Sequence, residues 1–232
     1  MKRSVAIIPA AGEGVRMGAD RAKQFLDLHG RPLLVLTLER FQECPAIDGI
    51  ILVVPPEDVE YCRKEIVESH GLSKVEKIVA GGERRQESVR LGIEASGGEY
   101  DLVLIHDGVR PFIDSGLIKR LLAAARKHGA AITALPARET VKEVDSDGLI
   151  IKTYARKQVW LAQTPQAFKY EDIMRAHQRA VEEGWEEVTD DASLLEKMGI
   201  PVKVIPGSEE NIKVTTPHDM EFARFLIRRL KT

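Results

Sequence analysis

The 232-residue sequence has little cysteine, almost no net charge and no long apolar run. Its two cysteines, Cys44 and Cys62, lack the close spacing of a disulfide framework or a zinc site, so we expect them to pack as small apolar residues. The formal net charge of −2 argues against a nucleic-acid partner, because a general polyanion binder carries a strongly basic surface. A small molecule is the predicted partner.

The apolar runs are too short to cross a membrane, which takes roughly 20 apolar residues. We therefore expect a cytoplasmic protein without a membrane partner. The start of the chain, basic Met1 to Arg3 followed by apolar Val5 to Ile8, is similar to the start of a secretory signal. However, this run is short and leads through Pro9 into a charged glycine loop instead of a cleavage site. A buried first strand is predicted there.

Short apolar runs alternate with helical patterns along the chain. Runs rich in β-branched residues and bounded by Gly, Pro or Asp predict strands at Val5–Pro9, Ile50–Val54, Val75–Val79, Leu102–Ile105 and Ala130–Leu135. Helices are predicted from Pro32 to Phe41 and from Gly116 to Lys127, the second capped by Ser115. This alternation predicts an α/β fold, a mostly parallel sheet flanked by helices. Residues 1–232 are predicted to form one domain.

One segment, at about residues 138–155, breaks this alternation. Apolar residues flank the dipeptide Asp147-Gly148, which favours a tight hairpin turn. A lone two-stranded ribbon is barely stable in water. We therefore interpret the segment as a projecting β-arm that packs on a second copy of the chain, and a hairpin lying on its own domain is the alternative.

The loop after the first predicted strand, residues 9–23, has the composition of a phosphate cradle. Its glycines and alanines let backbone amides approach an anion, and Arg16 and Lys23 add two cations. It is not a dinucleotide-binding fingerprint, because Met17 stands where the third glycine belongs. It is not a Walker A loop either, since no Gly-Lys-Ser or Gly-Lys-Thr sequence follows.

Two further loops follow predicted strands. Asp107 lies at the carboxyl end of the strand at 102–105, where a carboxylate can bind magnesium or a substrate hydroxyl, and Arg110 adds a cation. The structural alternatives are a turn former and a surface charge. His106 is expected to be packed and hydrogen-bonded rather than catalytic. The loop at residues 80–89 exposes backbone groups that could read a base edge, although a capped helix start explains it equally well.

The later motifs have structural explanations of their own. Thr189 and Asp190 can cap a helix that runs to Met198, and metal binding by Asp190 and Asp191 is the alternative. Lys213 is predicted to lie on an alternating strand, where it could simply be solvated. Trp160 and Phe168 are expected in the core.

These motifs together resemble the 2-C-methyl-D-erythritol 4-phosphate cytidylyltransferase family, in order and over nearly the whole chain. The resemblance rests on Pro9 to Met17, Lys23-Gln24-Phe25, Gly81-Gly82, Arg84, Ser88-Val89, His106-Asp107, Arg110-Pro111, Thr164-Pro165-Gln166, Thr189-Asp190, Ala192-Ser193 and Asn211 to Thr215. Mild departures are Glu83, where the family pattern often has Asp, and Gly108 and Val109, where it often has Ala.

The resemblance implies a Rossmann-like nucleotidyltransferase fold and a homodimer formed through the β-arm. It implies the transfer of CMP from CTP to methylerythritol phosphate, with release of pyrophosphate, in non-mevalonate isoprenoid synthesis. By the same resemblance, the CTP phosphates would be held by Ala10, Ala11, Gly12, Gly14, Arg16 and Lys23, and the cytosine by Gly82, Glu83 and Ser88. Asp107 and Arg110 would lie between the two substrates, Thr164, Thr189 and Lys213 would bind the acceptor, and Thr140 and Arg156 would reach the partner subunit's site.

Such a reaction needs charge stabilisation more than a base, because the attacking phosphate is already an anion. We expect Arg16, Lys23 and Mg²⁺ to neutralise the triphosphate, with Asp107 as the candidate metal ligand, and Arg156 and Lys213 to orient the acceptor phosphate. Two alternatives stay open. One is a cytidylyltransferase for another alditol phosphate, such as ribitol 5-phosphate, and the other is a non-catalytic nucleotide-binding regulator.

Overall fold

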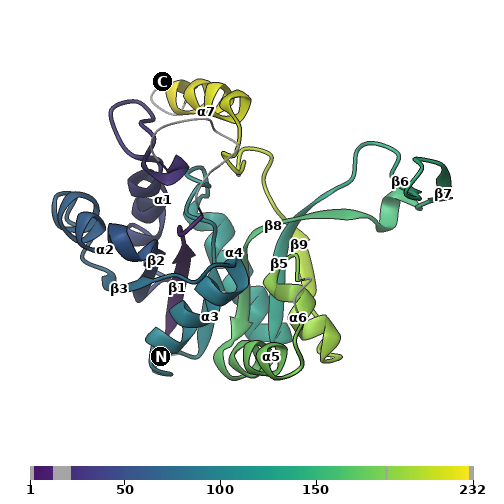
Figure 1. The fold of residues 1–232 in the computed structure, drawn as a ribbon, viewed down its shortest axis with the longest axis horizontal. Helices are drawn as coiled ribbons and strands as arrows, with labels where there is room; N and C mark the ends of the chain where they lie inside the picture. The colour runs from purple at the N-terminus through teal and green to yellow at the C-terminus, as the bar shows by residue number, and fades with distance from the viewer. Residues whose placement is uncertain (1–2, 13–21, 186–187, 230–232) are drawn as a thin grey trace.

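The computed structural model describes residues 3–12, 22–185 and 188–229, and its centre is a mixed sheet (Figure 1). The strand order is β3-β2-β1-β4-β8-β5-β9. The strands span Ser4–Pro9 (β1), Gly49–Val54 (β2), Val75–Ala80 (β3), Leu102–Ile105 (β4), Ala130–Pro136 (β5), Trp160–Lys169 (β8) and Lys203–Pro206 (β9). Only β8 runs antiparallel to its neighbours β4 and β5 among these pairings. The predicted α/β fold with a mostly parallel sheet is confirmed.

The five strands predicted from the short apolar runs all occur, each within one residue of its expected bounds. The sequence did not predict β8 or β9. The polar residues Gln163, Thr164 and Gln166, together with Pro165, interrupt the apolar pattern of β8 in the sequence. The strand expected around Lys213 is wrong, because residues 211–215 have no regular secondary structure. Their backbone is instead hydrogen-bonded to the loop after β4, where the Val214 amide donates to the Val109 carbonyl at 3.0 Å.

Most helices connect the strands and cover both faces of the sheet, whereas the last helix packs against the first in a separate apolar cluster. They span Leu33–Gln42 (α1), Val59–Tyr61 (α2, continued by a π-helical stretch at Cys62–Glu68), Arg85–Ala95 (α3), Ser115–His128 (α4), Tyr170–Glu182 (α5), Asp191–Lys197 (α6) and Pro217–Arg229 (α7). Helix α1 begins one residue after Pro32. The predicted cap of α4 is wrong: Asp114 caps this helix, its Oδ1 accepting from the Leu117 amide at 2.8 Å. Over the described ranges, no helix is both long and apolar enough to cross a membrane.

The core lies on the two sides of the sheet, as the side-chain alternation of a strand requires. On β1, Ala6 and Ile8 pack with α1 and α4, whereas Val5 and Ile7 pack with α3, α5 and α6. Burial on both faces explains why the central strands are continuous apolar runs. Both cysteines are buried, as expected, in the cluster with α1 and α4.

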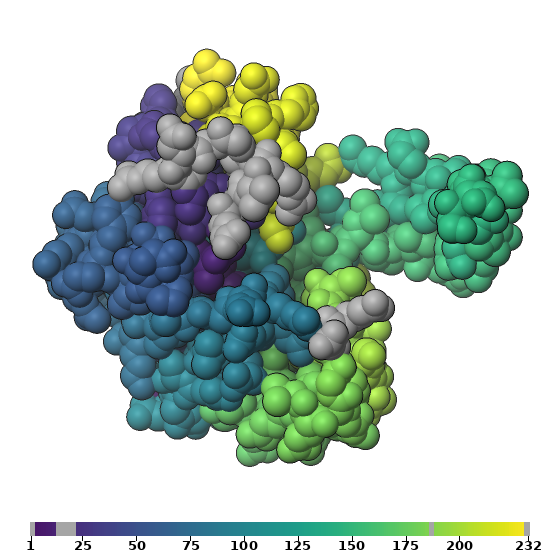
Figure 2. Space-filling model, viewed as in Figure 1, coloured from purple at the N-terminus to yellow at the C-terminus, as the bar shows by residue number. Residues whose placement is uncertain are grey.

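A two-stranded ribbon, β6 (Lys142–Val144) paired with β7 (Ile150–Thr153), stands away from this body (Figures 1 and 2). Gly148 takes the positive φ of 81° that the predicted hairpin turn requires. The hairpin is confirmed, and Leu149, Ile150 and Ile151 expose 61–66% of their surface on it. Trp160, expected in the core, is 40% exposed where β8 leaves the ribbon, whereas Phe168 is buried as expected.

Candidate functional site

The loops that follow β1, β3 and β4 surround a cavity that opens to solvent. These strands are mutually parallel through β2, so their carboxyl ends meet at one edge of the sheet. The lining residues are Pro9, Ala10, Ala11, Gly12, Lys23, Gln24, Gly82, Glu83, Arg84, Arg85, Ser88, Asp107, Val109 and Lys213. Motifs that the sequence places far apart therefore form one concave surface.

The predicted site residues divide into those at the cavity and those elsewhere. The cavity includes Ala10, Ala11, Gly12, Lys23, Gly82, Glu83, Ser88, Asp107 and Lys213. Arg110 and Thr164 lie behind it, in contact with Asp107. Thr189 is exposed just before α6, and Thr140 and Arg156 are exposed at the base of the arm. Gly14 and Arg16 lie outside the described residues.

Small residues on the β1 loop allow neighbouring loops to approach closely. A Cβ added at Gly81 would lie 2.5 Å from the Ala11 Cβ, and one added at Gly108 would lie 2.9 Å from the Ala10 Cβ. The Gly108 amide donates to the Pro9 carbonyl at 3.1 Å, which joins the β4 loop to the β1 loop. The small side chains are thus required for loop packing as well as for backbone access to a ligand.

The loop after β3 is held by the first turns of α3. The Gly82 amide donates to the Ser88 hydroxyl at 3.2 Å, and the Glu83 amide donates to a Glu87 carboxylate oxygen at 3.1 Å. Ser88 is buried, while Glu83 is exposed. The capped helix start is wrong, because no side chain caps α3 at its N-cap position Arg84, whereas the loop before α3 does line the cavity.

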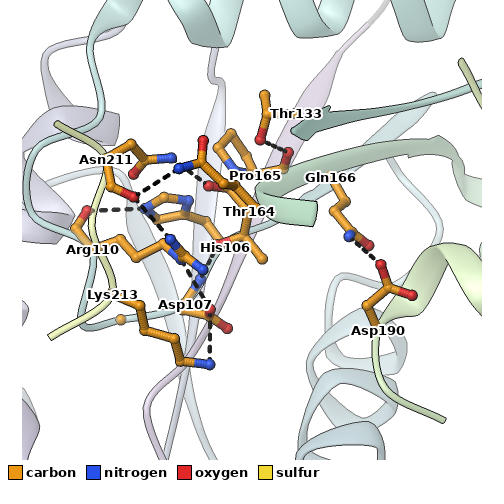
Figure 3. A network of polar contacts seen from close by, with 12 residues as sticks. His106, Asp107, Arg110, Thr133, Thr164, Pro165, Gln166, Asp190, Asn211 and Lys213 are labelled. Atoms are coloured by element: carbon orange, nitrogen blue, oxygen red, sulfur yellow. Dashed lines mark hydrogen bonds and ion pairs between the residues drawn. The ribbon is translucent and has the colours of Figure 1, made fainter. Parts of the chain in front are cut away.

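The Asp107 carboxylate is the electrostatic centre of the cavity. Its Oδ1 lies 3.2 Å from Arg85 Nε. Its Oδ2 lies 3.2 Å from Arg110 Nε and 3.1 Å from Lys213 Nζ (Figure 3). Burial alone would raise the pKa of Asp107, but Arg85, Lys213 and Arg110 together hold it well below its ordinary value. Asp107 is therefore ionised at neutral pH. Lys213 is accordingly an ion-pair partner, which excludes the simple solvated role.

The backbone around Asp107 is fixed by buried polar side chains. The Asp107 amide donates to the Thr164 hydroxyl at 3.1 Å, and the Thr37 hydroxyl donates to the Gly108 carbonyl at 3.0 Å. His106 Nε2 lies 3.1 Å from the Arg110 carbonyl (Figure 3), and its ring packs against Phe41 with centroids 5.0 Å apart. His106 is thus packed and hydrogen-bonded, as expected, and burial lowers its pKa to about 4.

This shifted pKa predicts a loss of stability on acidification. The unfolded chain binds a proton at His106 near pH 6.5 and the folded chain only near pH 4, so the free energy of unfolding falls as the pH drops between these values. From pH 7 to pH 4.5, the wild type should lose roughly 2–3 kcal/mol more than a His106→Gln variant, measured by urea unfolding. His128→Gln, on an exposed histidine of α4, should behave like the wild type. Equal losses in wild type and His106→Gln would contradict the assignment.

Sequence reasoning missed Arg85, and it considered Asp191 only as a possible metal ligand and not as an ion-pair partner. Arg85 Nη1 lies 2.9 Å from Asp191 Oδ2, and Asp191 Oδ1 lies 3.4 Å from His177 Nε2. One signal was available: an arginine at the first position of a helix faces the positive end of the helix dipole, so it needs acidic partners. Asp190 caps α6 as predicted, accepting from the Ser193 amide at 3.1 Å. In the part of the chain that the structure describes, no three His, Cys, Asp or Glu side chains are grouped to hold a metal.

Comparison with known families decides the membership. A family model described as IspD, 2-C-methyl-D-erythritol 4-phosphate cytidylyltransferase, matches residues 4–229. The chain belongs to this family. The resemblance inferred from the motifs is therefore confirmed.

Relatives in the IspD family match the chain from end to end. The chain is 49% identical over 226 residues to a 2-C-methyl-D-erythritol 4-phosphate cytidylyltransferase of Geobacter metallireducens, covering 96% of this chain and 97% of that protein. It is also 49% identical over 225 residues to the Syntrophus aciditrophicus protein of the same name, with 97% and 96% covered. Among solved structures, 4-diphosphocytidyl-2C-methyl-D-erythritol synthase from Anaerococcus prevotii is similar with a TM-score of 0.86 and 36% identity, over 98% of this chain and 97% of that one. This chain therefore has the nucleotidyltransferase fold of that solved structure.

Proposed function

We propose that this chain is a cytidylyltransferase that joins CTP and 2-C-methyl-D-erythritol 4-phosphate into 4-diphosphocytidyl-2-C-methyl-D-erythritol and pyrophosphate, in non-mevalonate isoprenoid synthesis. Its membership of the IspD family supports the reaction. The structural observation that best supports this reaction is the cavity itself. Loops of small residues, Lys23 and the Asp107–Lys213 ion pair all line it. Both proposed substrates are charged metabolites, which supports a cytoplasmic location.

The proposed nucleotide half of the site uses backbone groups and cations. Ala10, Ala11 and Gly12 would present backbone amides to the triphosphate, and Lys23 would neutralise it, together with Gly14 and Arg16 from outside the described residues. Gly82, Glu83 and Ser88 line the cavity from the β3 loop and would bind the cytosine. The base would thus lie against α3 and the phosphates against the β1 loop.

The proposed acceptor half is built around Lys213. Its ammonium would attract the acceptor phosphate, whose oxygen attacks the α-phosphorus while pyrophosphate departs with the P–O bond electrons. Asp107 keeps Lys213 at the cavity wall, and Arg110 and Thr164 fix Asp107 from behind. Thr164 and Thr189 remain our candidates for contacts with the acceptor. No general base is required, because the attacking group is already ionised.

A magnesium ion fits this residue set. Mg²⁺ is commonly bound by one or two carboxylates together with substrate phosphates, so Asp107 and the triphosphate would hold it. The ion would supply charge neutralisation at the phosphates.

We also propose that the arm forms a homodimer and carries Thr140 and Arg156 to the partner's cavity. Both residues are exposed and neither lines the cavity of its own chain. The arm has a large apolar surface at Leu149, Ile150 and Ile151 that a second copy would cover. The active site would then contain residues of two subunits.

The dimer proposal predicts the effect of charge on the arm. Adjacent strand residues face opposite sides, so Ile150→Lys combined with Ile151→Lys places a charge on both faces of β7. We expect this variant to elute as a monomer in size-exclusion chromatography with light scattering, and to lose activity with the dimer. Val181→Lys on α5 is a matched control, since Val181 is 64% exposed outside the arm. A doubly substituted chain that stays dimeric would contradict the arm interface.

Turnover with defined substrates tests the proposed function. The chain, CTP, Mg²⁺ and methylerythritol phosphate should yield pyrophosphate and a product with the mass of the cytidyl diphosphate. Competition with ribitol 5-phosphate tests the acceptor, and a preference for ribitol 5-phosphate would overturn that assignment. CTP binding without turnover on either acceptor would indicate a regulator instead of an enzyme.

A further inference from the structure

Arg85 connects two acidic side chains that belong to different parts of the fold. Its Nε lies 3.2 Å from Asp107 Oδ1, after β4, and its Nη1 lies 2.9 Å from Asp191 Oδ2, at the start of α6. Both carboxylates are almost fully buried, with side-chain exposures of 8% and 1%. The arginine itself is one-third exposed and lines the cavity. One planar guanidinium therefore bridges two buried anions.

The position of Arg85 in the sequence gives this bridge a third connection. Arg85 is the first residue of α3, and the next turn of α3 supplies Ser88 and Glu87, which hold the Gly82 and Glu83 amides. The side chain of Arg85 thus ties the proposed base-binding loop to Asp107. Asp191 anchors the same side chain on α6, and His177 supports Asp191 from α5 at 3.4 Å.

Arg85 and Lys213 share Asp107 through different oxygens. Arg85 approaches Oδ1, whereas Lys213 and Arg110 approach Oδ2. Without Arg85, the whole carboxylate charge would act on the remaining two cations. Lys213 would then be held more tightly by Asp107 and would be less available to a phosphate in the cavity.

We propose that Arg85 is a positioning residue. It fixes the distance between the base-binding loop and the Asp107–Lys213 pair, and it weakens the electrostatic attraction of Asp107 for Lys213. This inference rests on the proposed transferase function. The proposed role is to position the groups that bind the substrates, since Arg85 acts through Asp107 and need not touch the reacting atoms. Asp191 keeps the Arg85 side chain in place through their ion pair and is therefore a second positioning residue.

The first test separates binding from turnover. Arg85→Ala should lower kcat by about 10²-fold, the typical cost of misplacing reacting groups by about 1 Å, while the Kd for CTP measured by calorimetry changes only a few-fold. Arg85→Lys should recover part of kcat, because an ammonium can pair with one carboxylate but cannot bridge two in a planar fork. Arg90→Ala is the matched control. Arg90 lies on the same helix, pairs with Glu94 and does not line the cavity.

Asp191→Asn provides the second test, because it leaves the charge of Arg85 in the cavity and weakens its anchor, together with the contact between Asp191 and His177. We expect kcat to fall with an unchanged Kd for CTP. Added guanidinium ion should restore turnover of Arg85→Ala in a saturable manner, and its effect should be weaker in the double variant with Asp191→Asn. Thermal melts identify variants that fail to fold, for which Arg85→Lys replaces Arg85→Ala in the comparison.

Three results would overturn this inference. They are wild-type kinetics in Arg85→Ala, a loss of CTP affinity as large as the loss of kcat, and a neutral Asp191→Asn substitution. The second result would identify Arg85 as a direct nucleotide ligand. Failure of the wild-type chain to turn over CTP would instead refute the proposed function, so the two failures are distinguishable.

Discussion

Replacing Lys23 with alanine is expected to lower kcat by about 10²- to 10³-fold, the usual cost of losing one preorganised group that stabilises a charged transition state. Lys23 begins the short 3₁₀ helix at Lys23–Phe25 and lines the cavity beside Ala10, Ala11 and Gly12. During attack at the α-phosphorus, negative charge moves onto the departing pyrophosphate. The cation on this side of the cavity should therefore bind the transition state more strongly than bound CTP.

Steady-state kinetics with a pyrophosphate-release assay measure this effect. A larger fall in kcat than rise in KM for CTP is expected, since the interaction strengthens as charge develops. Lys119→Ala, which removes an exposed lysine from α4, should leave both constants unchanged. Near-normal turnover of the Lys23→Ala chain would refute the role of this lysine.

Mixing two inactive chains should restore activity if the arm completes the partner's site. Arg156→Ala alone is expected to lower kcat by about 10²- to 10³-fold, because one orienting cation is lost. In a heterodimer of Arg156→Ala and Lys23→Ala chains, one of the two sites contains both intact residues. When equal amounts of the two chains exchange at random, half of the dimers are heterodimers. Each heterodimer has one intact site of two, so about a quarter of all sites should recover wild-type turnover.

The control for this experiment lies next to Arg156 on the same 3₁₀ turn, Arg156–Gln158. Lys157→Ala should stay active by itself, which shows that the local change of charge is tolerated. Subunit exchange is verified by differently tagged chains that co-purify. If heterodimers form and activity does not return, Arg156 does not act in the partner's site.

The strand pattern allowed the sequence to predict much of the site. Ala10, Gly82 and Asp107 all follow apolar runs, and the carboxyl ends of parallel strands lie together at one edge of the sheet. The expectation that these loops surround one space needed no knowledge of side-chain contacts. The hairpin was equally accessible, because Asp147-Gly148 encodes its turn locally.

Contacts between distant segments could not be predicted in the same way. Arg85 and Asp191 are 106 positions apart, and only the packing of α6 against the sheet brings them together. The strand β8 carries Pro165 and several polar residues, so its alternation is weak and its antiparallel place between β4 and β5 has no local signature. Lys213 was assigned to a strand because its neighbours alternate, whereas the segment is held by the Val214 amide bonding to the Val109 carbonyl at 3.0 Å.

The close packing of Gly81 on Ala11 and of Gly108 on Ala10 has a consequence for how such a sequence can diverge. A methyl group gained at Gly81 would meet the Ala11 Cβ at 2.5 Å and the Ser88 Oγ at 2.8 Å, so it has room only if the β1 loop loses a methyl group and the Ser88 side chain turns aside. A substitution at Gly81 should therefore be accepted only together with a compensating change at position 11. Among natural variants, positions 11 and 81 should vary together, although 70 residues of sequence separate them.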